Sequence, residues 1–174
     1  MTVVVSGLVL GLFLTACSGD GESTSPSATP TTAPPTTAAP VPPRPDPKVG
    51  ACHELAFDAA TEAVDKNPPV PCRKEHTSVT FAVGQLDLLD DGHLLAMDSA
   101  QVGAQLDTTC ERGVRDWVGG SAEDFRLSRF RSIWFRPDVK EADRGAAWYR
   151  CDVVAVAREG KLARLDGDLK GALD

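Results

Sequence analysis

The sequence is poor in the residues from which metal sites and nucleophilic centres are usually built. Its 174 residues include only three histidines and five cysteines. No cysteines have the Cys-x-x-Cys spacing of a zinc ribbon, and no histidines have the His-x-x-x-His spacing that places both rings on one helix face. A Gly-x-Ser-x-Gly nucleophile elbow is also missing. The sequence therefore predicts no metal, no cofactor and no catalytic residues, and we do not expect an enzyme.

Positive charge is scarce as well. The chain has 18 Lys and Arg against 25 Asp and Glu, a formal net charge of -7 and a sequence pI of about 4.9. Because an acidic surface repels other polyanions, neither nucleic acid nor an anionic membrane surface is expected as a charge-driven partner. The densest basic stretch, Arg126, Arg129, Arg131 and Arg136, alternates with apolar residues and is interpreted as the solvent side of a strand.

The N-terminal segment has no charged residue. Residues 2–16 are apolar but too short to span a bilayer as a mature helix, so residues 1–16 are predicted to be a signal peptide. Leu14-Thr15-Ala16-Cys17 resembles a lipobox, which predicts that Cys17 is lipidated and becomes the mature N-terminus. The alternative is a plain secretory signal in which Cys17 is incidental. The basic residues that usually precede such a segment are missing, and a start codon placed too far downstream would explain this.

Residues 17–48 are dominated by Ser, Thr, Ala, Pro and Gly, with almost nothing apolar to bury. Such a segment cannot offset its own ordering entropy, so a disordered linker is predicted. Prolines favour polyproline II at ~3.1 Å per residue, and about thirty residues would then reach on the order of 90 Å from the lipid. The Thr and Pro clusters suit either O-glycosylation or a bare spacer.

Residues 49–174 are predicted to form one domain. Apolar and polar residues alternate from Val79 to Gly84, which indicates a strand, and Asp90-Asp91-Gly92 indicates a turn. An amphipathic helix is predicted over 99–118, and two further strands over 125–135 and 148–157. The expected fold class is α+β, a small antiparallel sheet of about four or five strands with one main helix packed on it.

This domain contains an even set of cysteines, Cys52, Cys72, Cys110 and Cys151. In an oxidising compartment such a set forms two disulfides, and spacing alone does not choose among the three connectivities. Cys110 lies on the apolar helix face with Val102, Leu106, Val114 and Trp117, and Cys151 shares one strand face with Tyr149, Val153 and Ala155. Because a helix packed on a sheet brings these two faces together, we predict Cys110–Cys151 and, by elimination, Cys52–Cys72.

Several short segments of this domain together carry a resemblance to a known family. They are Val49–Cys52, Val70–His76, Cys110 ahead of Trp117, Trp134–Pro137, Gly145, Cys151 and Gly167–Gly171. In this order they resemble the septum formation domain of actinobacterial membrane proteins and lipoproteins, over most of residues 49–171. The chain departs from the family pattern at Glu75, Ala142 and Ala146-Ala147. The resemblance implies a role in envelope growth or septum formation, and it implies no catalytic activity.

His76 is the best single candidate for a functional side chain, because it completes the Cys-x-x-x-His motif that begins at Cys72. Its alternative is structural, with a ring nitrogen bonded to a backbone carbonyl beside the disulfide, and we favour this interpretation. His53 and His93 carry weaker signals. The aromatic residues either line a binding groove or fill the core; they are Trp117, Trp134, Trp148 and Tyr149.

These features predict a lipoprotein held to the extracytoplasmic face of the cell membrane through Cys17. Its domain is expected to bind an envelope protein or a cell-wall polymer without catalysis. The alternative is a small-ligand-binding or metal-dependent enzyme domain with a site around His76 and the nearby aromatics. A deep polar pocket with converging histidines and carboxylates would favour that alternative.

Overall fold

The computed structural model of the chain describes residues 44–174. The predicted signal peptide, Cys17 and the linker as far as residue 43 lie outside the described residues. At Arg44 the guanidinium donates to the main-chain oxygen of Asp65, and its Nε lies 3.2 Å from Oε1 of Glu141. The end of the predicted linker therefore contacts the domain, through long-range contacts that composition does not reveal.

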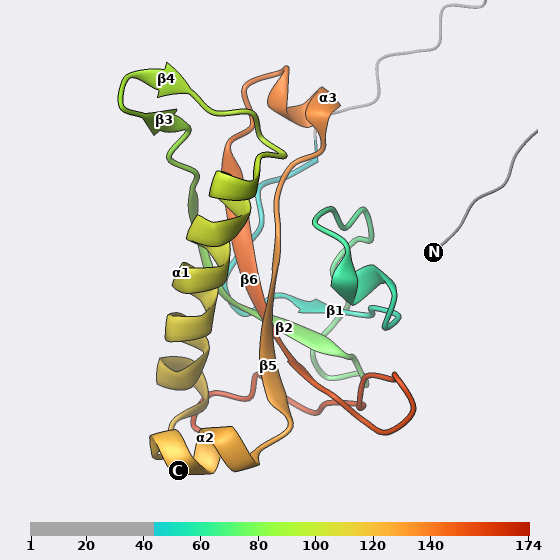
Figure 1. Cartoon of the computed structure of the whole chain (residues 1–174). Helices are drawn as coiled ribbons and strands as arrows, with labels where there is room; N and C mark the ends of the chain where they lie inside the picture. Colours follow the sequence, from blue (N-terminus) through green and yellow to red (C-terminus); the bar gives the residue numbers. More distant parts are fainter. Residues whose placement is uncertain (1–43) are drawn as a thin grey trace, which may run out of the picture. The chain divides into compact units, whose positions relative to one another are not determined.

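A four-stranded antiparallel sheet forms the centre of the domain, in the order β1-β2-β6-β5 (Figure 1). Its strands are β1 (Cys52–His53), β2 (Ser78–Gln85), β5 (Phe130–Phe135) and β6 (Trp148–Ala155). The two longest strands, β2 and β6, are the central ones, and their register places Val79 opposite Val153. This arrangement confirms the predicted α+β class with a small antiparallel sheet.

One long helix, α1 (Ala100–Val118), packs against β2, β5 and β6. The hydroxyl of Ser99 caps its start by accepting from the Val102 N–H at 3.3 Å, and Gly119 ends it with a φ of 74°. Its buried residues are Val102, Leu106, Cys110, Val114 and Val118. Val118, rather than the predicted Trp117, completes this row because it continues the i, i+4 spacing from Val114. Between Arg44 and Asp174, no helix combines the length and apolar character that a membrane crossing requires.

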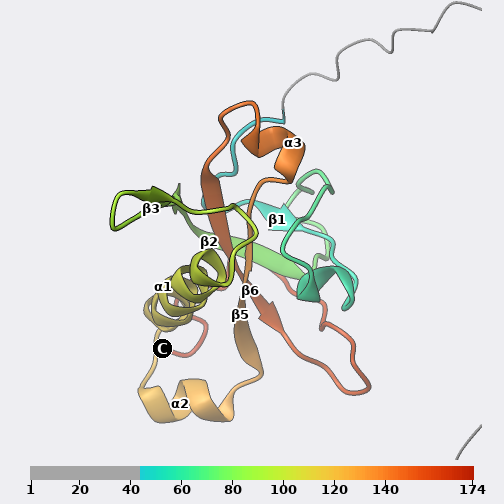
Figure 2. The same cartoon turned by 45° about the horizontal axis from the view of Figure 1, so that its top comes forward.

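The sheet face away from α1 is also covered. The segment that contains the short 3-10 helix η1 (Ala59–Thr61) lies on that side of the sheet (Figure 1 and Figure 2). It is held there by a hydrogen bond of 2.9 Å from the Arg136 N–H to the Ala63 oxygen, and Leu55 packs with Phe135 and Trp148. The alternation of side chains along β2 and β6 therefore predicts which residues share a face of the sheet. It does not predict that the face away from α1, which carries the polar residues, is buried as well.

Residues 122–127 form helix α2 (Ala122–Leu127) and not the beginning of a strand. Ser121 and Asp124 make a capping box, in which each side chain accepts from the other residue's backbone N–H at 3.2 and 2.9 Å. The prediction of a strand from Phe125 is wrong for this reason, and β5 begins at Phe130. Of the four arginines assigned to a strand, only Arg131 lies in one.

Three smaller elements complete the domain. Strands β3 (Leu89–Asp90) and β4 (His93–Leu94) form a hairpin at the predicted Asp-Gly turn, where Asp91 and Gly92 have φ values of 48° and 79°. Helix α3 (Val139–Ala142) precedes β6.

Both predicted disulfides are present. Cys52–Cys72 joins β1 to the segment before β2, with a Cα–Cα distance of 5.3 Å. Cys110–Cys151 joins α1 to β6 at 5.4 Å, so the inference from a helix packed on a sheet is confirmed. In the loop-entropy model each bridge stabilises the domain by about 3–4 kcal/mol.

Candidate functional site

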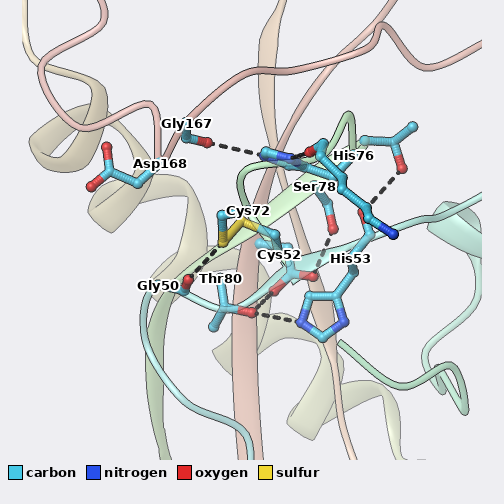
Figure 3. Close-up of a disulfide and its surroundings, with 12 residues drawn as sticks. Gly50, Cys52, His53, Cys72, His76, Ser78, Thr80, Gly167 and Asp168 are labelled. Carbon is cyan, nitrogen blue, oxygen red and sulfur yellow. Dashed lines mark hydrogen bonds between the residues drawn. A yellow bond between two sulfur atoms is a disulfide. The ribbon is translucent and has the colours of Figure 1, made fainter. Parts of the chain in front are cut away.

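His76 lies directly after the Cys52–Cys72 disulfide, and its ring is fully buried (Figure 3). The ring Nδ1 is 2.8 Å from the Lys74 oxygen and Nε2 is 3.0 Å from the Gly167 oxygen. The backbone of His76 also exchanges hydrogen bonds with Leu165. These contacts tie the segment after Cys72 to the C-terminal segment, and neither ring nitrogen is free to meet a ligand.

A different histidine has one nitrogen unoccupied. His53 in β1 is 3% exposed, and its Nε2 lies 3.2 Å from the Thr80 hydroxyl, which donates to Asp152 Oδ1 at 2.7 Å (Figure 3). Because that hydroxyl has one hydrogen and gives it to Asp152, Thr80 accepts from His53, so Nε2 carries the ring hydrogen. Nδ1 is then a hydrogen-bond acceptor, and no group within residues 44–174 is bonded to it.

Burial favours the uncharged form of the His53 ring. Desolvation lowers the pKa of His53 below its ordinary value; the Asp152 carboxylate opposes this shift and the Arg150 guanidinium adds to it. A neutral imidazole with its hydrogen on Nε2 presents a lone pair at Nδ1. The ring therefore offers an acceptor to a neighbouring group.

Arg150 continues this buried polar network in β6, the strand that also contains Asp152. Its Nη2 lies 2.6 Å from Asp65 Oδ2 and 3.1 Å from Asp152 Oδ2, and its guanidinium stacks 4.4 Å from the centre of the Phe135 ring. All three charged residues are at most 4% exposed. One cation thus faces two carboxylates, which compensates its burial. The Nε donor of Arg150 has no partner among the described residues.

A hollow of about 320 Å³ lies beside this network. It is lined by His53, Arg150 and Trp148 from the sheet and by residues of two proline-rich segments, 44–48 and 66–69. His76 is not among the lining residues. The structure therefore brings Trp148 to His53 and not to His76.

The other aromatic residues are used elsewhere. The indole N–H of Trp117 donates to the Asp168 oxygen at 2.9 Å, and that of Trp134 donates to Asp107 at 2.6 Å. Tyr149 packs with the apolar cluster around Leu106. His93 is exposed in β4. The sequence-based expectation gave His53 little weight, although its place directly after a disulfide cysteine in a strand was a usable signal.

A second, wider hollow of about 560 Å³ lies between α1, α2 and β5. Arg112 and Arg115 from α1 line it together with Arg126 and Arg131. Arginines from distant parts of an acidic chain thus share one surface. A strand at Arg126 does not predict this shared surface, because Arg126 lies in α2.

Within residues 44–174, no group of three or more His, Cys, Asp or Glu side chains is placed to hold a metal ion. Comparisons of the chain with protein-family models, with curated proteins and with solved structures found no match. The resemblance to the septum formation domain therefore stays a prediction made from the residues themselves.

Proposed function

We propose that this protein is an exported lipoprotein whose domain binds a partner at the extracytoplasmic face of the cell membrane without catalysing a reaction. The observation that carries the proposal is that all four cysteines of residues 44–174 are paired in two disulfides. Three of these cysteines are at most 1% exposed, so the bridges are part of the core. Disulfides of this kind persist in oxidising compartments and are rare in the cytosol.

The membrane attachment rests on Leu14-Thr15-Ala16-Cys17. Cys17 stands outside the paired set, and a free thiol on an exported chain would be open to oxidation. A diacylglyceryl group on Cys17 removes that thiol and supplies two acyl chains, which anchor a protein stably where a single chain does not.

A binding role is supported by the residues of the hollow beside His53. Its lining contains one histidine and one carboxylate, Asp46, and no hydroxyl or thiol. The lining therefore contains no Ser, Thr or Cys nucleophile that a neighbouring base could activate. The alternative site around His76 lacks support, because both nitrogens of that ring face backbone oxygens. We take the partner to be an envelope protein or a cell-wall polymer, with septum formation as the process that the resemblance suggests.

Replacing Cys17 with alanine tests the anchor. The wild-type chain should incorporate a labelled fatty acid and sediment with membranes, and the variant should do neither. Ser18→Ala, one position later, is the matched control and should behave as the wild type. Wild-type protein that partitions into the aqueous phase with an unmodified Cys17 thiol would contradict the proposal.

A further inference from the structure

We infer that the outer edge of β5 binds an extended peptide of a partner protein as a further strand of the sheet, with basic and apolar side chains alternating along that peptide. The inference rests on the proposed function, since it selects a protein over a cell-wall polymer as the partner. Three features of this edge carry it: main-chain groups without partners, a hollow along the edge, and the charge of the hollow's walls.

The outer side of β5 has main-chain groups without hydrogen bonds. β5 is the last strand of the sheet, and β6 is its neighbour. The Arg129 oxygen accepts from the segment that follows β6, whereas the Arg136 N–H donates away from β6, to the Ala63 oxygen. Because main-chain groups alternate in direction along an antiparallel strand, those of Ser132 and Trp134 also face outward. No group within residues 44–174 is hydrogen-bonded to them.

Both ends of this free stretch are closed. At one end the Arg131 guanidinium donates to the Phe130 oxygen at 2.5 Å, and at the other end the Arg136 N–H is bonded to Ala63. Exposed sheet edges attract further strands, and proteins usually cover them. The two uncovered residues, Ser132 and Trp134, therefore mark the place where another strand can pair.

A hollow of about 620 Å³ lies along the free stretch. From the sheet, three residues of β5 line it: Ser132, Ile133 and Trp134. The other lining residues are 60–63 from the η1 segment and Asp107 and Glu111 from α1. Because α1 and the η1 segment cover opposite faces of the sheet, a hollow that both of them line passes around the outer edge of β5 (Figure 1 and Figure 2).

The two walls of the hollow differ in character. The Trp134 side chain points toward α1, where its indole N–H donates to Asp107 at 2.6 Å, and Glu111 lies one turn further along the same helix. Ile133 points to the opposite face and packs with the apolar cluster there, beside residues 60–63, two of which are alanines. Successive side chains of an added strand would face these walls in turn. A peptide that alternates basic and apolar residues fits both.

The charge of the hollow selects cations. Its lining has three carboxylates, Glu62, Asp107 and Glu111, and no Lys or Arg. None of the three forms an ion pair within residues 44–174. Like charges four residues apart on a helix repel each other, so a cation beside Asp107 and Glu111 is favoured. A second copy paired through the same edge would place these two carboxylates opposite their equivalents, which disfavours self-association.

The experiment uses the full lipidated chain in dodecyl maltoside, an uncharged detergent, at about 0.15 M salt, which screens distant surface charges. The probe is a fluorescently labelled peptide of sequence Lys-Val-Lys-Val-Lys-Val with blocked ends, and fluorescence anisotropy measures its binding. We expect saturable binding that slows hydrogen exchange of the Ser132 and Trp134 N–H groups. Exchange at Arg131 and Ile133, whose N–H groups face β6, should not change. The peptide with Glu in place of Lys should not bind.

Methylation of single peptide nitrogens tests strand addition without changing the protein. In an antiparallel pair, a peptide residue opposite Ser132 or Trp134 shares the α1-facing side and directs its N–H to β5. These residues are the lysines, and the valines direct their N–H groups away. N-methylation of the central lysine should weaken binding at least about tenfold, the effect of one lost hydrogen bond, whereas N-methylation of the adjacent valine should change it less than about twofold.

Two variants of the protein test the charge. Asp107→Asn keeps an acceptor for the Trp134 indole, and Glu62→Gln keeps the length of its side chain. Each should weaken binding of the basic peptide about twofold to fivefold, the effect of one exposed ion pair. Glu75→Gln, at an exposed position outside the lining, is the matched control and should leave binding unchanged. Glu111 is left intact because it also lines the arginine-lined hollow.

Three outcomes would overturn the inference. One is no saturable binding of the basic peptide up to about 1 mM. Another is binding that slows exchange at neither Ser132 nor Trp134. The third is an equal effect of the two N-methylations, which would show that charge alone holds the peptide. Acylation of Cys17 is measured separately, so failure here and failure of the proposed function are distinguishable.

Discussion

Replacing His76 with alanine tests whether this histidine is structural. Its ring is fully buried, and its nitrogens lie 2.8 Å and 3.0 Å from the main-chain oxygens of Lys74 and Gly167. Alanine removes both contacts and opens a cavity between the segment after Cys72 and the C-terminal segment. The two segments would then be held together there mainly by the backbone pairing of His76 with Leu165.

The expected loss of stability follows from two contributions. The imidazole ring always carries at least one N–H, and both neighbouring oxygens are acceptors, so at least one of the two contacts is a donated hydrogen bond, worth about 1 kcal/mol. Removing the buried ring atoms and leaving a cavity adds about 1–3 kcal/mol. The free energy of unfolding should therefore fall by about 2–4 kcal/mol, which lowers the urea midpoint by about 1–2 M for a domain of this size.

Urea unfolding of the full chain with its disulfides intact is the assay, with and without a chelator. His93→Ala is the matched control, since His93 is exposed in β4, and its free energy of unfolding should stay within about 0.5 kcal/mol of the wild type. A role as a metal ligand requires the opposite pattern. If the chelator destabilises the wild type while His76→Ala unfolds at the same urea concentration as the untreated wild type, the structural interpretation is refuted.

Two further predictions concern the buried polar network. Arg150→Met leaves Asp65 and Asp152 buried without their cation, so it should lower the free energy of unfolding in urea by about 3–5 kcal/mol. The control is Arg131→Met at an exposed position, which should change the free energy of unfolding by less than about 0.5 kcal/mol. Equal urea midpoints for the two variants would contradict the compensation of Arg150 by these two carboxylates. Because burial lowers the pKa of folded His53, the unfolded chain takes up a proton first as the pH falls below about 6.5. Stability should then decrease by up to about 1.4 kcal/mol per pH unit until the folded pKa is reached. His53→Gln removes this contribution, so the stability difference between wild type and variant should shrink from pH 7 to pH 5; a constant difference would show that His53 does not titrate this way.

Some features of the fold could be predicted because their causes lie within a few residues of each other. The apolar spacing of α1, the Ser99 cap and the stop at Gly119 are all local, and the structure has the helix where they place it. The disulfide partners also followed, because the period of a helix and that of a strand each assign a cysteine to a face. The strand predicted over 125–135 is wrong at its start, because the Ser121 and Asp124 capping box, which is visible in the sequence, begins a helix that the alternation of arginines with apolar residues does not reveal.

The sequence by itself determined the class of the domain, its main helix and the pairing of its cysteines. Only the tertiary structure decided what covers the second face of the sheet and which buried charges meet there. Arg150 and Asp65 are separated by 85 residues, and nothing in the neighbourhood of either predicts their ion pair. A period of two tells which side chains share a face but not whether water or protein lies against it. That difference makes Arg150, Asp152 and His53 a buried network instead of a solvated strand surface.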